Sequence, residues 1–582
     1  MKNLFTLKKY FIRYKKKLIL GALFVILSNA GMIYIPLIIK DAINALTVKV
    51  SIPQLIHFSI LIVLASLFAG FFRYLIRQMI IVVSREIEYD LREDFWAHIQ
   101  KLPLRYFQNN STGNVMAHAT NDINAVRSFL GPAVMYSTDT AIRLVIVISV
   151  MISLNPSLTF YSLLPLPLLS ILVYKIGKLI HEKFTLIQEK FSELTTKAQE
   201  NFAGIRVIKS YVREENEIKQ FQKLSKDFLD RNMDMIKIQA YLQPILFLIT
   251  GLSVIIVIWL GGIKIIHGSL NLGDLTAFIA YLGILTWPMI AFGWVINMVQ
   301  QAEASMKRLN KIFDEPYEIE DNDNTNQSIK DLNGKIEFKN VSFKYSENLP
   351  NVLNKINLTI PAGSTLAIMG YTGEGKTSLI NLIPRLYDCT EGEVLIDGEN
   401  VKSIPLQLLR TKIGVVQQES FLFSDTIANN ITYGLRESGR EKVLESSKIA
   451  HFDKDVDNFP QGYETIMGER GITLSGGQKQ RASLARAVAI DPKILILDDS
   501  FSAVDTNTEE EILKSLKEFM KDRTSIIISH RISTVKDADK IIVLSKGTIS
   551  EEGTHDELIS RGGIYADLHY KQLLEKELEE LN

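Results

Sequence analysis

The sequence predicts two fold classes in one chain: an all-α membrane domain of six helices, followed by an α/β domain with a central parallel sheet. Hydrophobic residues make up 47% of the 582 residues, and the long apolar stretches fall within roughly the first 300 of them. Charged residues and glycine-containing loops gather in the remainder, where short apolar runs end in glycine or aspartate. We therefore expect the first half in a bilayer and the second in water.

The overall charge and the cysteine content exclude some classes of protein. Lysines and arginines number 65, and so do aspartates and glutamates, so the zero net charge gives no indication of a nucleic-acid partner. The single cysteine, Cys389, excludes an internal disulfide framework and a zinc cluster of cysteines. This usage fits a second half that folds in a reducing cytosol.

Six apolar segments are long enough to cross a hydrocarbon core of about 30 Å as helices. Residues 1–17 contain seven lysines and arginines, and positive charge beside a first span favours a cytoplasmic N-terminus. Six spans return the chain to the same side, so we expect both termini in the cytoplasm. The expected spans are Leu18–Ile39, Leu55–Val83, Ala133–Leu154, Leu158–Ile176, Tyr241–Ile266 and Leu275–Val299.

Two long connections between these spans are predicted to be intracellular helical hairpins. Arg85–Leu130 holds five basic residues and Lys178–Lys237 holds twelve, whereas the connections on the other side are short and nearly uncharged. Each long segment has helical periodicity and a break near its middle, at residues 109–113 and at Gly204. Arms of about 25 residues would carry each bend roughly 35 Å below the membrane. Such bends are suited to contact a cytosolic domain.

Four charged residues interrupt the second and third spans: Arg73, Arg77, Asp139 and Arg143. Charges inside a membrane are costly and usually face a protein interior or a water-filled cavity. An Arg/Asp pair or snorkelling toward the headgroups is the favoured interpretation. The alternative is a substrate cavity that contains Arg73 and Arg143 at similar depth and favours anionic or amphipathic cargo.

A phosphate-binding loop follows the domain boundary. Residues 1–315 are the expected membrane domain, the acidic and amide-rich stretch 316–333 a linker, and residues 334–582 the second domain. The buried strand Thr365–Met369 leads into a full GxxxxGK[ST] motif before a helix, the context in which backbone N–H groups curl round nucleotide phosphates. The nucleotide-binding residues expected here are Gly370, Thr372, Gly373, Gly375, Lys376, Thr377 and Ser378.

Two further patterns point to phosphate and metal chemistry. The apolar run at residues 493–497 ends in Asp498 and Asp499, which is typical of a central strand that delivers carboxylates to the edge of a sheet. These carboxylates predict a site for a metal and a water. The small residues Ser475, Gly476 and Gly477 precede a helix, where exposed N–H groups favour an anion.

These motifs carry a resemblance to a known family. LSGGQ at 474–478, ILILDD at 494–499 and SAVD at 502–505 resemble the signature motif, the Walker B strand and the D-loop of ABC ATPases. The resemblance implies that Asp498 binds Mg²⁺, that Asp499 holds the attacking water and that Asp505 is the D-loop aspartate. Residues of about 424–487 resemble the helical subdomain of these ATPases, and Gly468–Gly471 resembles an exporter-specific loop.

Three residues outside these motifs match further positions of the family. Tyr345 matches the aromatic residue that stacks on adenine, and Gln418 matches the glutamine that meets both Mg²⁺ and the coupling helices. His530 matches the switch histidine at the γ-phosphate. The resemblance thus implies ATP and Mg²⁺ as ligands, with Asp499, His530 and Gln418 as catalytic residues.

The membrane half is similar to the transmembrane domain of ABC exporters. The phrases LRYFQNNSTGNVMAHATNDINAVRSF and QENFAGIRVIKSYVREE resemble the regions of its two coupling helices. The whole chain therefore resembles a half-transporter of a prokaryotic plasma membrane, which works as a dimer on an unidentified substrate. In that dimer the residues that act on the partner's ATP are Ser475, Gly476, Gly477 and Gln478.

One departure from the family pattern concerns the position after the Walker B aspartate. Most ABC ATPases carry glutamate there, and this chain has Asp499. The sequence resembles the degenerate-site subunit of heterodimeric multidrug-type exporters, although the retained His530 leaves a homodimer open. A homodimeric exporter, a lipid flippase and an ATP-switched membrane sensor or channel are the remaining alternatives.

Overall fold

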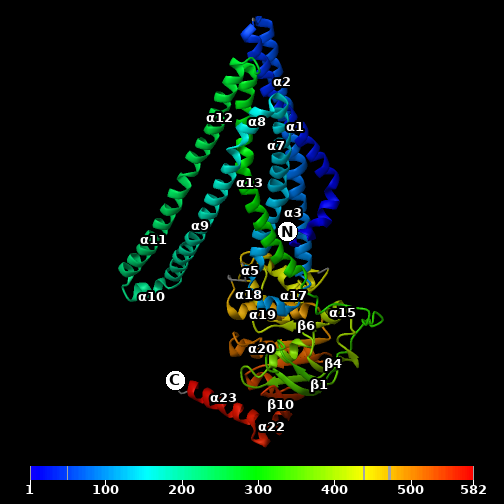
Figure 1. The fold of residues 1–582 in the computed structure, drawn as a ribbon. Coiled ribbons are helices and arrows are strands. Elements are labelled where there is room, and N and C mark those ends of the chain that lie inside the picture. Colours follow the sequence, from blue (N-terminus) through cyan, green and yellow to red (C-terminus); the bar gives the residue numbers. More distant parts are fainter. Residues whose placement is uncertain (1, 49, 437–438, 469–473, 581–582) are drawn as a thin grey trace. The chain divides into compact units, whose positions relative to one another are not determined.

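A computed structural model describes residues 2–48, 50–436, 439–468 and 474–580. The chain divides into two compact units (Figure 1). The helical unit comprises Met1–Ile99 and Thr112–Glu315, and the sheet unit comprises Gln100–Ser111 and Pro316–Asn582. The short segment Gln100–Ser111, which joins the second and third spans, thus groups with the sheet unit.

The regular elements of the helical unit, over its described residues, are α-helices with short 3-10 and π turns. Six of its helices, counted over the described residues, are long and apolar enough to cross a membrane, as the sequence predicts. Its elements are η1 (Lys2–Leu7), α1 (Lys8–Val48), α2 (Ile52–Ile76), η2 (Arg77–Ile81), α3 (Val82–Ile99), α5 (Thr112–Ala117), η3 (His118–Asp122), α6 (Ile123–Ser128), η4 (Phe129–Ala133), α7 (Val134–Leu154), α8 (Pro156–Leu163), α9 (Leu166–Ala203), α10 (Ile205–Ser210), α11 (Glu214–Ala240), α12 (Leu242–Ile266) and α13 (Leu272–Phe313).

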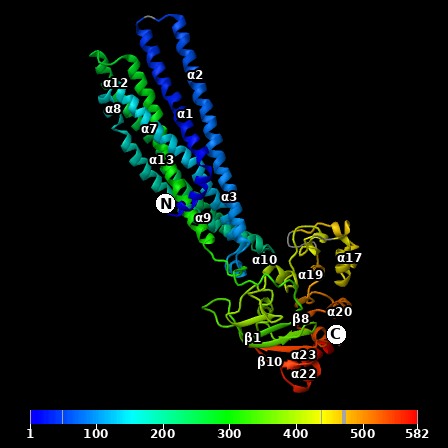
Figure 2. The same cartoon turned by 90° about the vertical axis from the view of Figure 1, so that its right-hand side faces the viewer.

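The helices of this unit extend well beyond the apolar segments. The first two run antiparallel and side by side as α1 and α2 (Figure 2). The second of the two predicted hairpins is formed by α9 and α11, which meet at α10 (Figure 1) and are joined by the Lys197–Glu217 ion pair at 2.6 Å. Helix α9 ends at Ala203, and its C-cap is Gly204, the position of the predicted break.

The fourth span differs from the continuous helix that we expected over Leu158–Ile176. Helix α8 ends at Leu163 and α9 begins at Leu166, with a turn between them. Pro165 and Pro167 lack the backbone N–H that an uninterrupted helix needs at these positions. The span is therefore built from two helices in sequence.

The core of the helical unit forms where α13 packs against α1, α7, α8 and α12. Phe278 and Tyr281 of α13 are fully buried together with Val257 of α12 and Leu158 of α8. The Tyr281 hydroxyl donates to the carbonyl oxygen of Ile33 in α1 at 2.9 Å. The apolar faces of the spans therefore pack against one another as well as facing the lipid.

The described residues of the sheet unit form two sheets. A four-stranded antiparallel sheet has the order β2-β1-β4-β5, and a six-stranded sheet has the order β10-β9-β3-β8-β7-β6, in which all strands but β10 are parallel. The strands are β1 (Ile336–Phe343), β2 (Leu353–Ile360), β3 (Thr365–Met369), β4 (Glu391–Ile396), β5 (Glu399–Asn400), β6 (Ile413–Val416), β7 (Ile494–Asp498), β8 (Thr524–Ile528), β9 (Lys540–Ser545) and β10 (Thr548–Gly553).

Helices cover both faces of the six-stranded sheet. The helices of the sheet unit are α4 (Leu104–Asn109), α14 (Lys376–Asn381), α15 (Leu406–Thr411), α16 (Ile427–Ile431), α17 (Arg440–Ile449), α18 (Asp453–Val456), η5 (Gly462–Glu464), α19 (Gly476–Ala489), α20 (Thr506–Met520), α21 (Ile532–Val535), α22 (His555–Arg561) and α23 (Ile564–Glu580), with α4 preceding the sheets in the chain. Because successive side chains of a strand point to opposite faces, the parallel strands contribute to two separate cores. In β3, Leu366 and Ile368 pack with α14, whereas Ala367 and Met369 pack with α19.

Candidate functional site

The phosphate-binding loop lies between β3 and α14, the context that its motif requires. Gly370, Gly373 and Gly375 all have positive φ, at 142°, 88° and 90°. A β-carbon at Gly370 would collide with the carbonyl oxygen of Leu544, so glycine is needed there for space as well as for conformation. The loop is thus shaped to bring backbone N–H groups round an anion.

Lys376 is the buried cation of this loop. Its side chain is 8% exposed, and Nζ donates to the carbonyl oxygens of Gly370 and Tyr371, both at 2.8 Å. Burial lowers the pKa of Lys376, while the nearby carboxylates of Asp498 and Asp499 act in the opposite direction. The ammonium group therefore lies inside the loop, where phosphate oxygens would be better partners than neutral carbonyls.

Two carboxylates face this loop from the end of β7. Asp498 is 4% exposed and accepts a hydrogen bond from the Thr377 hydroxyl at 2.9 Å. Burial raises the pKa of Asp498, and the charge of Asp499 adds to this effect. Asp499 has φ of 46° and donates its N–H to the carbonyl oxygen of Ile528 at 2.9 Å, so its main chain is anchored on β8.

The order of the parallel strands brings further predicted residues to the same edge. Strands β3, β8, β7 and β6 are neighbours in that order. The phosphate-binding loop follows β3, His530 follows β8, Asp498 and Asp499 end β7, and Gln418 follows β6. The side chains of Gln418 and His530 are exposed. All four segments therefore lie along the carboxyl edge, where ligands bind in open α/β sheets.

Tyr345 belongs to an aromatic cluster next to α14. Its ring lies 4.9 Å from that of Phe343 and 5.4 Å from that of Tyr387 between centroids, and its hydroxyl lies 2.7 Å from the Ser378 hydroxyl. Its carbonyl oxygen accepts from Arg105 Nε at 2.8 Å. Sequence reasoning selected Tyr345 and Ser378 separately but missed Arg105, because a contact over 240 residues leaves no local signal.

The signature segment forms the N-terminal end of α19 and does not adjoin the phosphate-binding loop in the sequence. Ser475 is its N-cap: Oγ accepts from the Gln478 N–H at 3.3 Å, and its own N–H donates to Gln478 Oε1 at 2.9 Å. Ser475 and Gly476 are exposed, and a β-carbon at Gly477 would lie 2.9 Å from the Ala503 carbonyl oxygen. The N-terminus of α19 is therefore at the surface, where its N–H groups would favour an anion.

A buried glutamine joins the signature helix to the segment after Asp499. Gln480 Nε2 donates to Ser502 Oγ at 3.0 Å, and Gln480 Oε1 accepts from the Ala503 N–H at 3.0 Å. The predicted D-loop aspartate, Asp505, caps α20 by accepting from the Thr508 N–H at 2.9 Å. Asp505 therefore has a structural role in this chain, whatever it contacts in an assembly.

The structure does not bring the two phosphate-binding elements of the chain together. Helix α14 contributes Leu379 and Ile380 to the core on one face of the sheet, and α19 contributes Leu484 and Val488 to the core on the other face.

The predicted exporter-specific loop at Gly468–Gly471 lies outside the described residues from position 469 onward.

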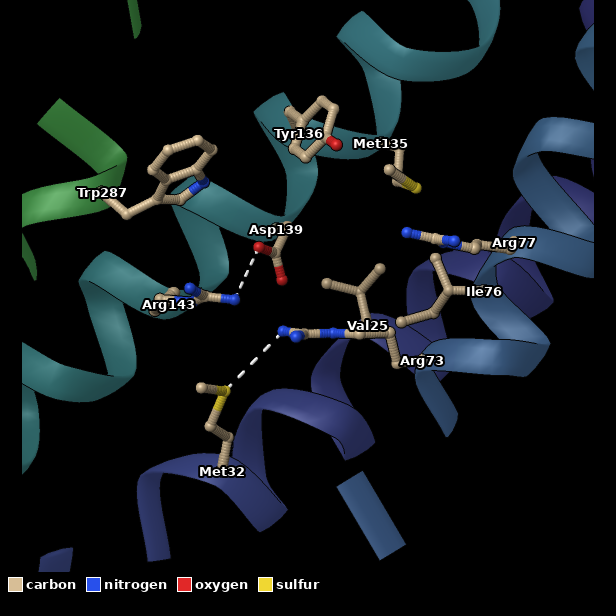
Figure 3. A pocket seen from close by; sticks show the side chains of 10 residues that line it. All are labelled: Val25, Met32, Arg73, Ile76, Arg77, Met135, Tyr136, Asp139, Arg143 and Trp287. Atoms are coloured by element: carbon tan, nitrogen blue, oxygen red, sulfur yellow. Dashed lines mark hydrogen bonds and ion pairs between the residues drawn. The ribbon is translucent and has the colours of Figure 1, made fainter. Parts of the chain in front are cut away.

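The candidate cavity residues Arg73 and Arg143 line one cavity in the helical unit (Figure 3). Arg143 is 7% exposed and donates from Nη2 to Asp139 Oδ2 at 2.8 Å, so it forms the Arg/Asp pair that the sequence favours. Arg73 is exposed, and its one hydrogen-bond partner among the described residues is the thioether sulfur of Met32, at 3.7 Å from Nη2.

Comparisons with known proteins agree with this geometry. Residues 18–289 match the family described as ABC transporter transmembrane region, and residues 353–502 match the ABC transporter family. The chain is 36% identical over 577 residues to the multidrug resistance-like ATP-binding protein MdlA of Buchnera aphidicola subsp. Schizaphis graminum, covering 98% of this chain and 99% of that one. It is 34% identical over 528 residues to MdlA of Escherichia coli, covering 90% and 89%.

A solved structure shows the same arrangement of elements. A bacterial Atm1-family ABC exporter with ATP bound superimposes with a TM-score of 0.80 and 28% identity, covering 96% of this chain and 98% of that one. The six membrane-capable helices identify a multi-pass membrane protein. The chain therefore belongs to the ABC transporter family, as an ATP-hydrolysing, multidrug-like exporter with its transmembrane and ATP-binding domains fused in one polypeptide.

Proposed function

We propose that this chain is one half of a heterodimeric exporter in which ATP hydrolysis drives small molecules, lipids or peptides out of the cell. The dimer rests on one observation: α14, the helix that follows the phosphate-binding loop, and the signature helix α19 pack on opposite faces of the same sheet. A single chain therefore offers two half-sites, and a second half-transporter supplies the complement of each.

The residues of the Walker half-site have separate roles in binding ATP. Backbone N–H groups of the loop and the Lys376 ammonium hold the phosphates, and Tyr345 stacks on adenine. Thr377 Oγ1 and the Asp498 carboxylate are hard oxygen donors that already lie 2.9 Å apart, so they fit Mg²⁺, with Gln418 as a further donor. The ion, when bound, neutralises charge on the phosphate oxygens.

The chemistry assigned to the chain's own residues is positioning and charge stabilisation. Asp499 orients the water that attacks the γ-phosphate in line, and His530 contacts that phosphate from the end of β8. Ser475, Gly476, Gly477 and Gln478 present the N-terminus of α19 to the partner's ATP. The nucleotide thus holds the two subunits together until it is hydrolysed.

The weak Walker half-site is the reason for proposing a heterodimer. Aspartate is one methylene shorter than the glutamate usual at position 499, so its carboxylate falls short of the water by roughly 1 Å, which can cost on the order of 10²-fold in rate. The anchored main chain of Asp499 supports this, because it cannot shift to compensate. The signature helix, which serves the partner, has all its family residues.

Transmission to the membrane uses the intracellular helices. Arg105, in the segment that joins the second and third spans, donates to Tyr345 and pairs with Glu318 at 3.2 Å, both within the sheet unit. A movement of Tyr345, the residue assigned to adenine, would therefore be transmitted through Arg105 to that segment. We place the protein in the plasma membrane of a prokaryote with both termini in the cytoplasm.

The test uses the full-length chain with its co-purified partner in nanodiscs. We expect Ser475→Ala to abolish most ATPase activity of the pair, whereas Asp499→Asn reduces it only modestly. Ser475→Thr, which keeps the helix cap, is the matched control for folding. A homodimer with substrate-stimulated ATPase activity that Asp499→Asn abolishes would refute the heterodimer, and ATP binding without turnover in either assembly would favour a sensor or channel.

A further inference from the structure

A cavity of about 350 Å³ lies between α1, the α2–η2 junction, α7 and α13 of the helical unit (Figure 3). This volume falls in the range of sites for small organic ligands. The cavity is formed by the membrane-spanning helices themselves, so its charged side chains lie at membrane depth. Its lining therefore indicates what kind of molecule can enter it.

The charged residues of the lining are unbalanced. Three arginines, Arg73, Arg77 and Arg143, face one carboxylate, Asp139, which leaves a surplus of two positive charges. Arg143 and Asp139 form a closed triangle with Asn29: Arg143 Nε donates to Asn29 Oδ1 at 3.0 Å, and Asn29 Nδ2 donates to Asp139 Oδ1 at 2.7 Å. The charge of Arg143 is therefore already compensated.

Arg73 and Arg77 are not compensated in this way. Over the described part of the chain, neither forms an ion pair, and the sulfur of Met32 that Arg73 reaches is a weak acceptor. Figure 3 shows both guanidinium groups extending from the second span toward α7. Because unpaired cations inside a membrane are costly, these two arginines are suited to bind an anion.

The rest of the lining is apolar and adaptable. It consists of Val25, Ile76, Met32, Met135, Tyr136 and Trp287. Methionine side chains adjust to ligands of different shape, and the indole and phenol rings offer flat apolar surfaces. A ligand that satisfies the whole cavity therefore has an anionic group on an apolar body.

We propose that this cavity binds amphiphilic anions, whose carboxylate, sulfonate or phosphate group pairs with Arg73 and Arg77 while the apolar body packs against Trp287 and the methionines. This inference rests on the proposed export function, for which it names a substrate class. A diffusible amphiphile and an anionic membrane lipid share this chemistry. The experiment has one arm for each source.

The first arm measures equilibrium binding without ATP to the full-length transporter in phosphatidylcholine nanodiscs. The probes are dansyl-labelled undecanoate and its uncharged amide, which have the same apolar body. We expect the anion to bind roughly tenfold or more tightly than the amide, with empty nanodiscs as the blank. Arg73→Gln and Arg77→Gln should each weaken anion binding by roughly tenfold and leave the amide unchanged.

Two variants separate charge from folding. Lys175→Gln removes an exposed cation of α9 outside the cavity and should keep the parent affinities. Arg73→Lys keeps the charge and should keep the preference for the anion. Equal affinity for the two probes, or an anion affinity that neither Arg→Gln variant lowers, would overturn the proposal, as would an Arg73→Lys variant that loses the preference.

The second arm replaces part of the phosphatidylcholine with phosphatidylglycerol. Competition with the undecanoate probe in the parent that disappears in the Arg73→Gln variant identifies an anionic lipid as the occupant, and unchanged probe binding identifies a diffusible amphiphile. Either result supports an anion site. Because binding is measured without ATP, charge-selective binding in a protein that does not transport would refute the export function and leave the site standing.

Discussion

Lengthening Asp499 by one methylene should make this chain's own Walker half-site faster. The main chain at Asp499 is held on both sides: its N–H bonds to Ile528, and its carbonyl oxygen accepts from the Ser502 hydroxyl at 3.1 Å. Side-chain length therefore decides where the carboxylate lies. Asp499→Glu adds one C–C bond of about 1.5 Å, and recovering roughly 1 Å of placement can be worth on the order of 10²-fold in rate, or about 3 kcal/mol of barrier.

The assay is single-site turnover in the assembled pair. The partner's Walker lysine is replaced so that only this chain's site hydrolyses, and phosphate release is measured at saturating ATP. We expect Asp499→Glu to raise kcat roughly tenfold to a hundredfold with little change in KM. Asp498→Glu, the matched lengthening at the residue that bonds Thr377, should lower turnover instead.

Because the backbone at position 499 is left-handed, the stability of the Asp499→Glu variant has to be measured as a control. Aspartate tolerates its φ of 46° somewhat better than glutamate, so the variant should lose a small part of its stability, less than about 1 kcal/mol. Thermal unfolding measures this loss separately. If Asp499→Glu folds normally and turnover is unchanged or lower, the shortened carboxylate is not what limits this site, and the case for a degenerate half-site fails.

Three more predictions concern single side chains. Lys376→Ala should abolish photolabelling of this subunit by an ATP analogue, because its buried ammonium is the cation of the loop, and undiminished labelling would refute the Walker assignment. Arg143→Ala should destabilise the protein by roughly 3 kcal/mol or more in thermal unfolding, because it leaves the Asp139 charge unpaired. The double variant Arg143→Met/Asp139→Leu should recover most of this loss. An Arg143→Ala variant as stable as the parent would contradict the prediction. Gln572→Leu should lower kcat roughly fivefold without changing KM for ATP, because its side chain holds the His530 carbonyl and the Ile532 N–H; a change in KM alone would contradict this positioning role.

The sequence alone predicts the fold well, because the strongest local signals coincide with the elements. Apolar length predicts six spans, and the break at Gly204 predicts the turn between α9 and α10. The π turn that starts at Arg77 has no such signal, because its sequence, RQMII, contains no glycine or proline that would interrupt an ordinary α-helix. The break between α8 and α9 was readable from Pro165 and Pro167, but apolar length outweighed it.

The candidate site is predictable in its parts and less so in its assembly. The motifs identify Lys376 and Asp498. The closeness of these two residues depends on the strand order, in which β3 and β7 lie on either side of β8, and the sequence does not state that order. The contact between Gln572 and His530 joins two segments that are 42 residues apart, and neither segment carries a motif that predicts the other as its partner. Pairings of this kind follow from the tertiary fold, in which a surface helix such as α23 is placed by packing rather than by a motif.

The hydrogen bonds of Gln480 have a consequence for how two nucleotides influence each other. Within one subunit they join the signature helix to the segment after Asp499, two elements that serve different ATP molecules in the dimer that we propose. A shift of either element moves both, so occupancy at one nucleotide changes the free energy of binding at the other, and this coupling is reciprocal. In the heterodimer that we propose, a half-site that hydrolyses slowly would retain its ATP for longer and would regulate nucleotide binding at the faster site for as long as it does so.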